Sequence, residues 1–185
     1  MINIQIAKTP VGSRGLFYIP YLAGASAPNW DPYAKGSFVG LTLAHDYGCM
    51  ARAVMEGISL ETREILESFE KLGLELKEVR ITGGGTKSDL WNQMQADIYG
   101  KPVSKLAIGE ATVLGAAILG GVGAGVFDSI EEGVEKMVRI EAQYEPDPVT
   151  HAIYDEVFEI YRNIYRSLAD GGVYKQIADY QDKHG

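Results

Sequence analysis

The chain has 185 residues, of which 46% are hydrophobic and 23% charged, a composition typical of one globular domain or one large lobe and not of a disordered protein. Its net charge of −8 argues against binding to nucleic acid or to an anionic membrane surface. The single cysteine, Cys49, excludes an intramolecular disulfide, and the three histidines argue against a dedicated zinc site. Because the chain has no disulfide, a reducing, cytoplasmic location is expected.

The first part of the chain predicts short strands followed by one long helix. Strands are expected at residues 2–6, 16–22 (interrupted by Pro20) and 37–43, with a loop rich in Gly, Pro and Asn over 23–36. From Tyr47 onward, apolar residues recur every three or four positions, which is the spacing of an amphipathic helix. Asp46 is its predicted N-cap and Gly73 its predicted stop.

Strands and helices then alternate, which favours an α/β architecture. A strand at 79–82 precedes a helix that Ser88 caps and Gly100 ends. A strand at 102–106 precedes a helix at 112–125, which lies in an uncharged run of 17 residues (111–127) with five glycines. The glycines, with acidic residues at both ends of the run, favour a tightly packed core helix over a membrane span.

The C-terminal part predicts two more helices and a frayed end. Ser129 begins a capping box, and Asp147 with Pro148 opens a last long helix. Its apolar face is predicted to be Val149, Ile153, Val157, Tyr161, Ile164 and Leu168. A second row, Tyr154, Phe158 and Tyr165, is expected to contact either a partner or a neighbouring helix. From Tyr174 the chain is polar and is expected to fray.

The most informative local feature is a triple glycine between a predicted strand and a capped helix, in the stretch RITGGGTKSDLWNQM. We call Gly83, Gly84 and Gly85 the glycine turn. Glycines let a ligand approach the backbone, and the helix N-terminus offers free N–H groups, so the turn is a candidate nucleotide site. A tight connection without a ligand is the equal alternative.

Two standard phosphate loops can be compared with this turn. The Walker pattern fails because Thr86, and not glycine, precedes Lys87. The dinucleotide fingerprint fits at Gly83 and Gly85 but has Ser88 at its sixth position. Glu110, after the next strand, stands where a ribose-binding acid is expected, so a dinucleotide-binding oxidoreductase domain stays open as an alternative.

Four ordered motifs resemble the C-terminal half of the FGGY carbohydrate kinases. They are GLFYIPYLAG with PNWDP (15–32), GSFVGL with ARAVMEG (36–57), the glycine turn followed by Trp91, Asp97 and Gly100, and EATVLGAA (110–117). Among the subfamilies, the sequences of these motifs resemble those of the xylulokinases most. Cys49 replaces a usually polar or acidic residue and Lys35 replaces a common Arg, which affects the subfamily assignment more than the family.

The resemblance implies the C-terminal lobe of an actin-like ATPase (ribonuclease H-like) fold, incomplete and with C-terminal helices. It implies that ATP and Mg²⁺ bind between two lobes and that a sugar hydroxyl, of a pentulose such as xylulose, attacks the γ-phosphate. The implied nucleotide-binding residues are Gly83, Gly84, Gly85 and Ser88, and the small-residue helix after Glu110 is expected nearby. The catalytic aspartate and the sugar contacts are expected on an N-terminal lobe, so no catalytic or metal-binding residue is assigned here and the chain alone is expected to be inactive.

The implied organisation is a leader or remnant at 1–14, the nucleotide-binding lobe at 15–172 and a polar tail at 173–185. A module of the same fold that binds nucleotide or protein without catalysis is the competing hypothesis. Aromatic residues cluster early in the chain, and their exposure would favour self-association, so a homodimer is a further expectation. They are Phe17, Tyr18, Tyr21, Trp30 and Tyr33.

Other polar residues have simpler interpretations. Glu61, Glu64 and Glu67, and likewise Glu131, Glu132 and Glu135, are expected on solvated helix faces. His45 is a poor acid/base partner for its neighbour Asp46 because adjacent residues do not face each other. Cys49 is expected to be a small buried thiol, and Asp31 an Asx-turn residue or a residue near the sugar or the lobe interface.

Overall fold

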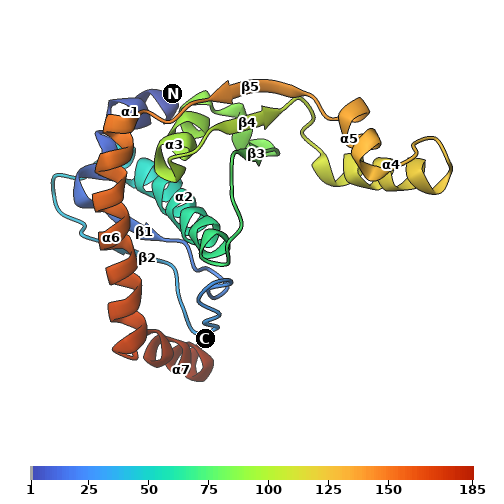
Figure 1. Ribbon diagram of the computed structural model, residues 1–185. Helices are drawn as coiled ribbons and strands as arrows, with labels where there is room; N and C mark the ends of the chain where they lie inside the picture. The colour runs from blue at the N-terminus through green and yellow to red at the C-terminus, as the bar shows by residue number, and fades with distance from the viewer. Residues whose placement is uncertain (1) are drawn as a thin grey trace.

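The computed structural model describes residues 2–185 as two small sheets and a set of helices (Figure 1). The helices are α1 (Ile2–Lys8), α2 (Tyr47–Lys71), α3 (Asp89–Tyr99), α4 (Ala111–Gly123), α5 (Ile130–Met137), α6 (Pro148–Asp170) and α7 (Val173–His184), with 3₁₀ turns η1 (Val11–Gly15) and η2 (Gly84–Lys87). The strands are β1 (Phe17–Ile19), β2 (Ser37–Val39), β3 (Val79–Ile81), β4 (Val103–Leu106) and β5 (Ile140–Tyr144). None of the helices over residues 2–185 is both long and apolar enough to cross a membrane.

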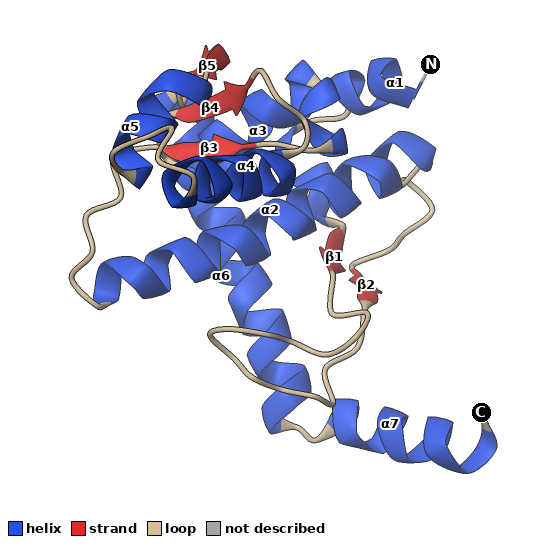
Figure 2. Cartoon of the chain, turned by 90° about the vertical axis from the view of Figure 1, so that its right-hand side faces the viewer, coloured by secondary structure: helices blue, strands red, loops and turns tan. Residues whose placement is uncertain are grey.

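The two sheets differ in direction. β1 and β2 pair antiparallel, whereas β3 pairs parallel with β4, and β4 pairs antiparallel with β5. The parallel strands β3 and β4 are connected through α3, as in a strand–helix–strand unit. Figure 2 shows this sheet well separated from β1 and β2, with α2 running between them. The α/β architecture expected from the sequence is confirmed.

The main core lies where α2, α3 and α6 meet. Tyr154, Phe158, Tyr161 and Tyr165 of α6 are all buried, together with Leu60 of α2. The predicted apolar face of α6 is therefore wrong in part: Val149 is 73% and Ile153 43% exposed. The row Tyr154, Phe158 and Tyr165 is covered by neighbouring elements of the same chain, as one of the two alternatives predicted.

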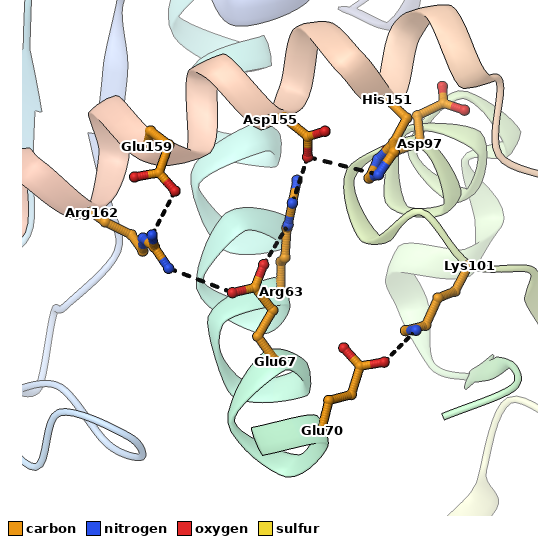
Figure 3. A network of polar contacts seen from close by, with 9 residues as sticks. All are labelled: Arg63, Glu67, Glu70, Asp97, Lys101, His151, Asp155, Glu159 and Arg162. Atoms are coloured by element: carbon orange, nitrogen blue, oxygen red, sulfur yellow. Dashed lines mark hydrogen bonds and ion pairs between the residues drawn. The ribbon is translucent and has the colours of Figure 1, made fainter. Parts of the chain in front are cut away.

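Charged side chains tie α6 to α2 and α3 around this core (Figure 3). Arg63 of α2 contacts Asp155 of α6 at 2.6 Å, and its guanidinium lies 4.4 Å above the Phe158 ring. Glu67, one turn further along α2, bridges Arg63 and Arg162. Glu67 is therefore partly buried, with its side chain 27% exposed, and the prediction that it lies on a solvated face is wrong in part. Glu61 and Glu64 are also half-buried, and burial, followed by the Glu64 charge, raises the pKa of Glu61.

A second cluster joins α2 to η1 through a buried carboxylate. Glu56 is 3% exposed and accepts hydrogen bonds from the Gly12 backbone N–H at 3.0 Å and the Ser13 hydroxyl at 2.7 Å. It also accepts from Arg52 Nε at 2.8 Å and from the Tyr154 hydroxyl at 3.0 Å. Burial, and then the Glu56 charge, raises the pKa of Tyr154, so its hydroxyl stays a donor.

These contacts hold a left-handed turn. Gly12, Ser13 and Arg14 have φ values of 74°, 48° and 56°. Two of the three are not glycine, and such residues cost free energy at positive φ unless their surroundings hold them there. Glu56 supplies two of the fixing contacts, so it stabilises a backbone conformation as well as a charge.

Close packing of α2 on β1 gives a first testable prediction. A Cβ at Gly57 would overlap the Tyr18 carbonyl oxygen, so Gly57→Ala must push the helix away from the strand. We expect a loss of about 1–3 kcal/mol in the free energy of unfolding, measured by urea denaturation. Gly115→Ala in α4, where a Cβ meets nothing within 4 Å, is the matched control and is expected to be neutral or slightly stabilising. Equal effects of the two substitutions would contradict this packing.

Several expectations about single elements are wrong. Residues 2–6 form part of helix α1 and not a strand, and the predicted strands at 16–22 and 37–43 shrink to three residues each. The C-terminal end does not fray: it forms α7, which buries Tyr174 and Ala178. The division of the chain at 14/15 and 172/173 stays a prediction.

The small-residue helix α4 is not a tightly packed core helix. Only Leu114 and Ile118 are buried on it, while Val113 is 64% and Leu119 60% exposed. α4 and α5 form a hairpin that projects away from the other elements (Figure 1). We call residues 108–138 the projecting hairpin.

Candidate functional site

The glycine turn lies between β3 and α3, as the sequence predicts. Ser88 is the N-cap of α3, and its hydroxyl oxygen accepts from the Trp91 backbone N–H at 3.3 Å. Gly100 ends α3 in the left-handed conformation, with φ 62°. The turn is neither α-helix nor strand: Gly83 has a positive φ of 91°, and the 3₁₀ turn η2 begins at Gly84. The predicted strand–turn–helix unit is confirmed.

The backbone of the glycine turn is open on one side. A Cβ built on Gly83 or Gly84 meets nothing within 4 Å, so a ligand can approach both residues closely. Gly83 requires glycine because its φ of 91° is rarely reached by other residues. A Cβ on Gly85 would lie 3.2 Å from the Trp91 ring. The turn therefore presents its first two glycines outward and rests its third on an aromatic side chain.

A series of hydrogen-bonded polar side chains links Tyr144 of β5 to Thr86, directly after the glycine turn. Asn92 is fully buried, and its amide donates to the Thr86 carbonyl at 2.9 Å and to the Tyr144 hydroxyl at 3.1 Å. Tyr144 in turn donates to Asp89 at 2.7 Å, and this hydrogen bond is the main cause of its raised pKa. Thr86 closes the turn through its hydroxyl, which donates to the Gly83 carbonyl at 2.8 Å.

Asn92 and Tyr144 were not predicted as site residues. Asn92 stands in the same stretch as the turn, but its role depends on a tyrosine 52 positions away. The strand that carries Tyr144 has a detectable signal, because residues 140–144 alternate apolar and polar side chains.

The start of the projecting hairpin lies beside the glycine turn. The Thr82 hydroxyl donates to the carbonyls of Ile108 at 2.8 Å and Gly109 at 3.1 Å. The expectation that the segment after Glu110 lies near the turn is consistent with this contact. A hollow of about 220 Å³ opens between the two segments, and Lys87 and Lys105 contribute to its lining.

The two lysines differ in their partners. Lys105 contacts Glu141 at 2.9 Å, and this hydrogen bond is the main cause of its raised pKa. Lys87 is exposed at the last position of η2. The arrangement thus combines open backbone, the N-terminus of an 11-residue helix and nearby cations, which together favour an anionic ligand.

The other candidate residues have structural roles. Asp46 caps α2 by accepting from the Cys49 backbone N–H at 2.9 Å, and the same contact is the main cause of its lowered pKa. His45 contacts Thr42 and the Arg14 carbonyl, and not Asp46. Cys49 is buried with 1% exposure, and Asp31 accepts from the Tyr33 backbone N–H as an Asx turn. The predicted helix cap, buried thiol and Asx turn are confirmed, and a role of Asp31 near the sugar or the lobe interface stays a prediction.

Acidic side chains do not assemble a metal site in the described part of the chain. No group of three or more Asp, Glu, His or Cys side chains over residues 2–185 is placed to hold an ion. Glu132 instead contacts Lys136 and the Asp128 backbone N–H, as the second half of a capping arrangement with Ser129.

The sequence matches a known family over most of its length. The model for the FGGY family of carbohydrate kinases, C-terminal domain, matches residues 3–124. A xylulose kinase of Bacillus subtilis is 39% identical over 165 residues, covering 89% of this chain and 33% of that protein. A glycerol kinase of Nitratidesulfovibrio vulgaris is 36% identical over 166 residues, with the same coverage of 89% and 33%.

Solved structures show the same relationship. A ligand-bound xylulose kinase from Lactobacillus acidophilus superposes with a TM-score of 0.83 at 33% identity, covering 91% of this chain and 34% of that one. A gluconate kinase from Lactobacillus acidophilus gives a TM-score of 0.82 at 33% identity, with the same coverage. The chain spans about a third of the length of the relatives it matches.

Proposed function

Since the chain belongs to the FGGY family of carbohydrate kinases, within their C-terminal domain, we propose that its glycine turn binds the adenosine part of ATP and ADP. In this proposal the bound ATP is the phosphoryl donor of a kinase, which transfers its γ-phosphate to a sugar hydroxyl. The names of the relatives favour a pentulose such as xylulose as the acceptor. A cytoplasmic location is part of the same proposal. So is self-association through Trp30 and Tyr33, which are 75% and 44% exposed; Phe17 and Tyr21 of the same aromatic cluster are buried in the core, so the expected exposure of the whole cluster is wrong.

The observation that carries this proposal is the open backbone of Gly83 and Gly84 at the N-terminus of α3. A flat base can lie against a backbone without side chains, where a branched side chain would fill the space. Ser88 keeps a hydroxyl hydrogen for a ligand because its oxygen, and not its proton, caps the helix. Gly85 contributes indirectly, because its Cα faces Trp91.

The chain's own residues bind and orient in this proposal, and they do not carry the proton transfer. The catalytic aspartate and most sugar contacts are assigned to an N-terminal lobe. The sugar is therefore expected to bind only when that lobe is present. The described carboxylates form no Mg²⁺ cage, and Mg²⁺ is commonly held largely by substrate phosphates and water. We therefore assign no residue of this chain to the metal.

The competing hypotheses make different predictions for ligand binding. The family match favours the kinase lineage over a dinucleotide-binding oxidoreductase. A thermal-shift comparison separates them: stabilisation by ADP without a response to NAD supports the kinase, and the reverse supports the oxidoreductase. A non-catalytic module of the same fold would keep ADP binding without contributing to turnover in any complex.

Substitution of Gly84 tests the site directly. Gly84→Val places a branched side chain in the open space, and because a Cβ there meets nothing within 4 Å, the fold is expected to remain intact. We expect ADP affinity, measured by calorimetry, to fall by at least tenfold, about 1.4 kcal/mol. Gly123→Val on the projecting hairpin, equally open, is the control and should bind ADP normally. Normal binding by a folded Gly84→Val variant would place the pocket elsewhere.

A further inference from the structure

We propose that Trp91 is a positioning residue for the glycine turn and that Ser59 of α2 fixes its indole ring. This inference rests on the proposed nucleotide site, because it assigns the groups that hold that site in shape. Trp91 is half-buried on the first turn of α3, and Ser59 is 1% exposed in the middle of α2.

The first observation is the contact between the ring and the turn. The Cβ direction of Gly85 points at the six-membered part of the Trp91 indole, with three ring atoms within 3.2–3.8 Å of a Cβ placed there. The ring is therefore the surface on which the third glycine rests. Because Gly83 and Gly84 contact nothing in their Cβ directions, Gly85 is the member of the turn that a neighbouring side chain fixes.

The second observation is the way the ring itself is held. The indole Nε1–H donates to Ser59 Oγ at 3.0 Å, while the Ser59 hydroxyl donates to the Met55 carbonyl at 2.9 Å. The backbone N–H of Trp91 donates to Ser88 Oγ. One end of the residue is thus tied to the N-cap of α3 and the other to α2, 32 positions away in the sequence.

The third observation is the space around the ring. Trp91 lines two separate hollows, one of about 460 Å³ with Met50 and Val54, and one of about 400 Å³ with Ile58 and Gly85. A ring with open space nearby is weakly confined by packing alone. The Ser59 hydrogen bond therefore decides where the ring lies, and through the ring it decides where Gly85 lies.

Removal of one hydroxyl is expected to loosen the turn without unfolding the protein. Ser59→Ala deletes the acceptor and leaves the ring intact, and the loss of one hydrogen bond corresponds to about a 2- to 10-fold effect. We expect amide hydrogen exchange across residues 83–88 to become faster and ADP to bind more weakly, each by about this factor. Ser68→Ala is the matched control because Ser68 also bonds a carbonyl of its own helix, that of Ile65, at 2.6 Å.

A spectroscopic readout distinguishes positioning from general destabilisation. The chain has two tryptophans, and Trp30 is 75% exposed, so a Trp30→Phe background leaves Trp91 as the only reporter. In that background Ser59→Ala is expected to shift Trp91 emission, whereas Ser68→Ala is not. In the presence of Trp91→Phe, which has no indole N–H, Ser59→Ala should add no further change in exchange or affinity.

The outcomes separate this inference from the proposed function. Faster exchange and weaker ADP binding in Ser59→Ala alone support both. If the unsubstituted chain binds no ADP but Ser59→Ala still speeds exchange across the turn, the nucleotide proposal fails and the positioning role stands. Unchanged exchange and emission would overturn the role of Trp91. In a chain that binds ADP, faster exchange with unchanged ADP affinity would overturn its role for the nucleotide.

Discussion

Glu56→Ala is expected to lower the free energy of unfolding by about 3–5 kcal/mol, because it leaves a buried arginine without its carboxylate. Arg52 is 7% exposed and also donates to the carbonyls of Ile6 and Thr9. Burial lowers the pKa of Arg52, but Tyr154 and Glu56 more than offset this, so the guanidinium stays charged. The substitution also removes two of the contacts that hold the left-handed turn of η1, those to Gly12 and Ser13.

Urea denaturation followed by circular dichroism measures this effect. Glu56→Gln keeps the size of the side chain and isolates the loss of charge, so it is expected to cost less than alanine. Glu67→Ala is the control on the same helix: its side chain is 27% exposed and its ion pairs are partly solvated, so about 0–1 kcal/mol is expected. A loss below 1 kcal/mol for Glu56→Ala would contradict the structural role of the cluster.

The second large effect concerns activity: the 185-residue chain on its own is expected to phosphorylate no sugar. Phosphoryl transfer depends on holding the γ-phosphate, the base and the acceptor hydroxyl together. In our proposal the glycine turn supplies only the adenosine contacts. Part of a cleft also buries only part of a ligand, so nucleotide affinity is expected to be weak.

A coupled assay of ADP release with Mg²⁺-ATP tests this prediction on xylulose, ribulose, gluconate and glycerol. A full-length xylulose kinase in the same assay is the positive control. Recovery of turnover when a separately expressed N-terminal half of such a kinase is added would support the split of functions. Turnover by the chain alone near the usual range of about 1–100 s⁻¹ would contradict it, and Asp31 and Asp46 would then be the first carboxylates to substitute.

The parts of the fold predicted correctly are those that local chemistry specifies. Asp46, Ser88 and Ser129 all cap helices as expected, because an N-cap needs only its own side chain and an N–H three residues later. The glycine turn was predicted for the same reason. Its supports were not, since Ser59 and Tyr144 reach it from distant segments.

The errors show where local patterns are ambiguous. Alternation over only five residues suggested a strand at 2–6, but a strand would place Ile4 and Ile6 on one face, whereas helix α1 buries Ile6 and leaves Ile4 62% exposed. In α7, Tyr174 and Ala178 are four residues apart, and the polar residues around them obscure this helical spacing. Glu56 could not be identified, because a buried carboxylate depends on partners 43 and 98 positions away.

The projecting hairpin affects which part of the molecule unfolds first. It leaves the sheet after β4 and returns at β5, where the Ala107 N–H already bonds the Arg139 carbonyl at 2.9 Å and Leu106 pairs with Ile140. Its buried side chains, Leu114 and Ile118, belong to α4, and Ile118 faces Gly133 of α5. These contacts close the base of the hairpin without α4 or α5, so we expect strand pairing there to persist when the hairpin unfolds. We therefore expect the hairpin to unfold as a separate cooperative unit, at a lower free energy than the rest of the chain, and to exchange its amide hydrogens first.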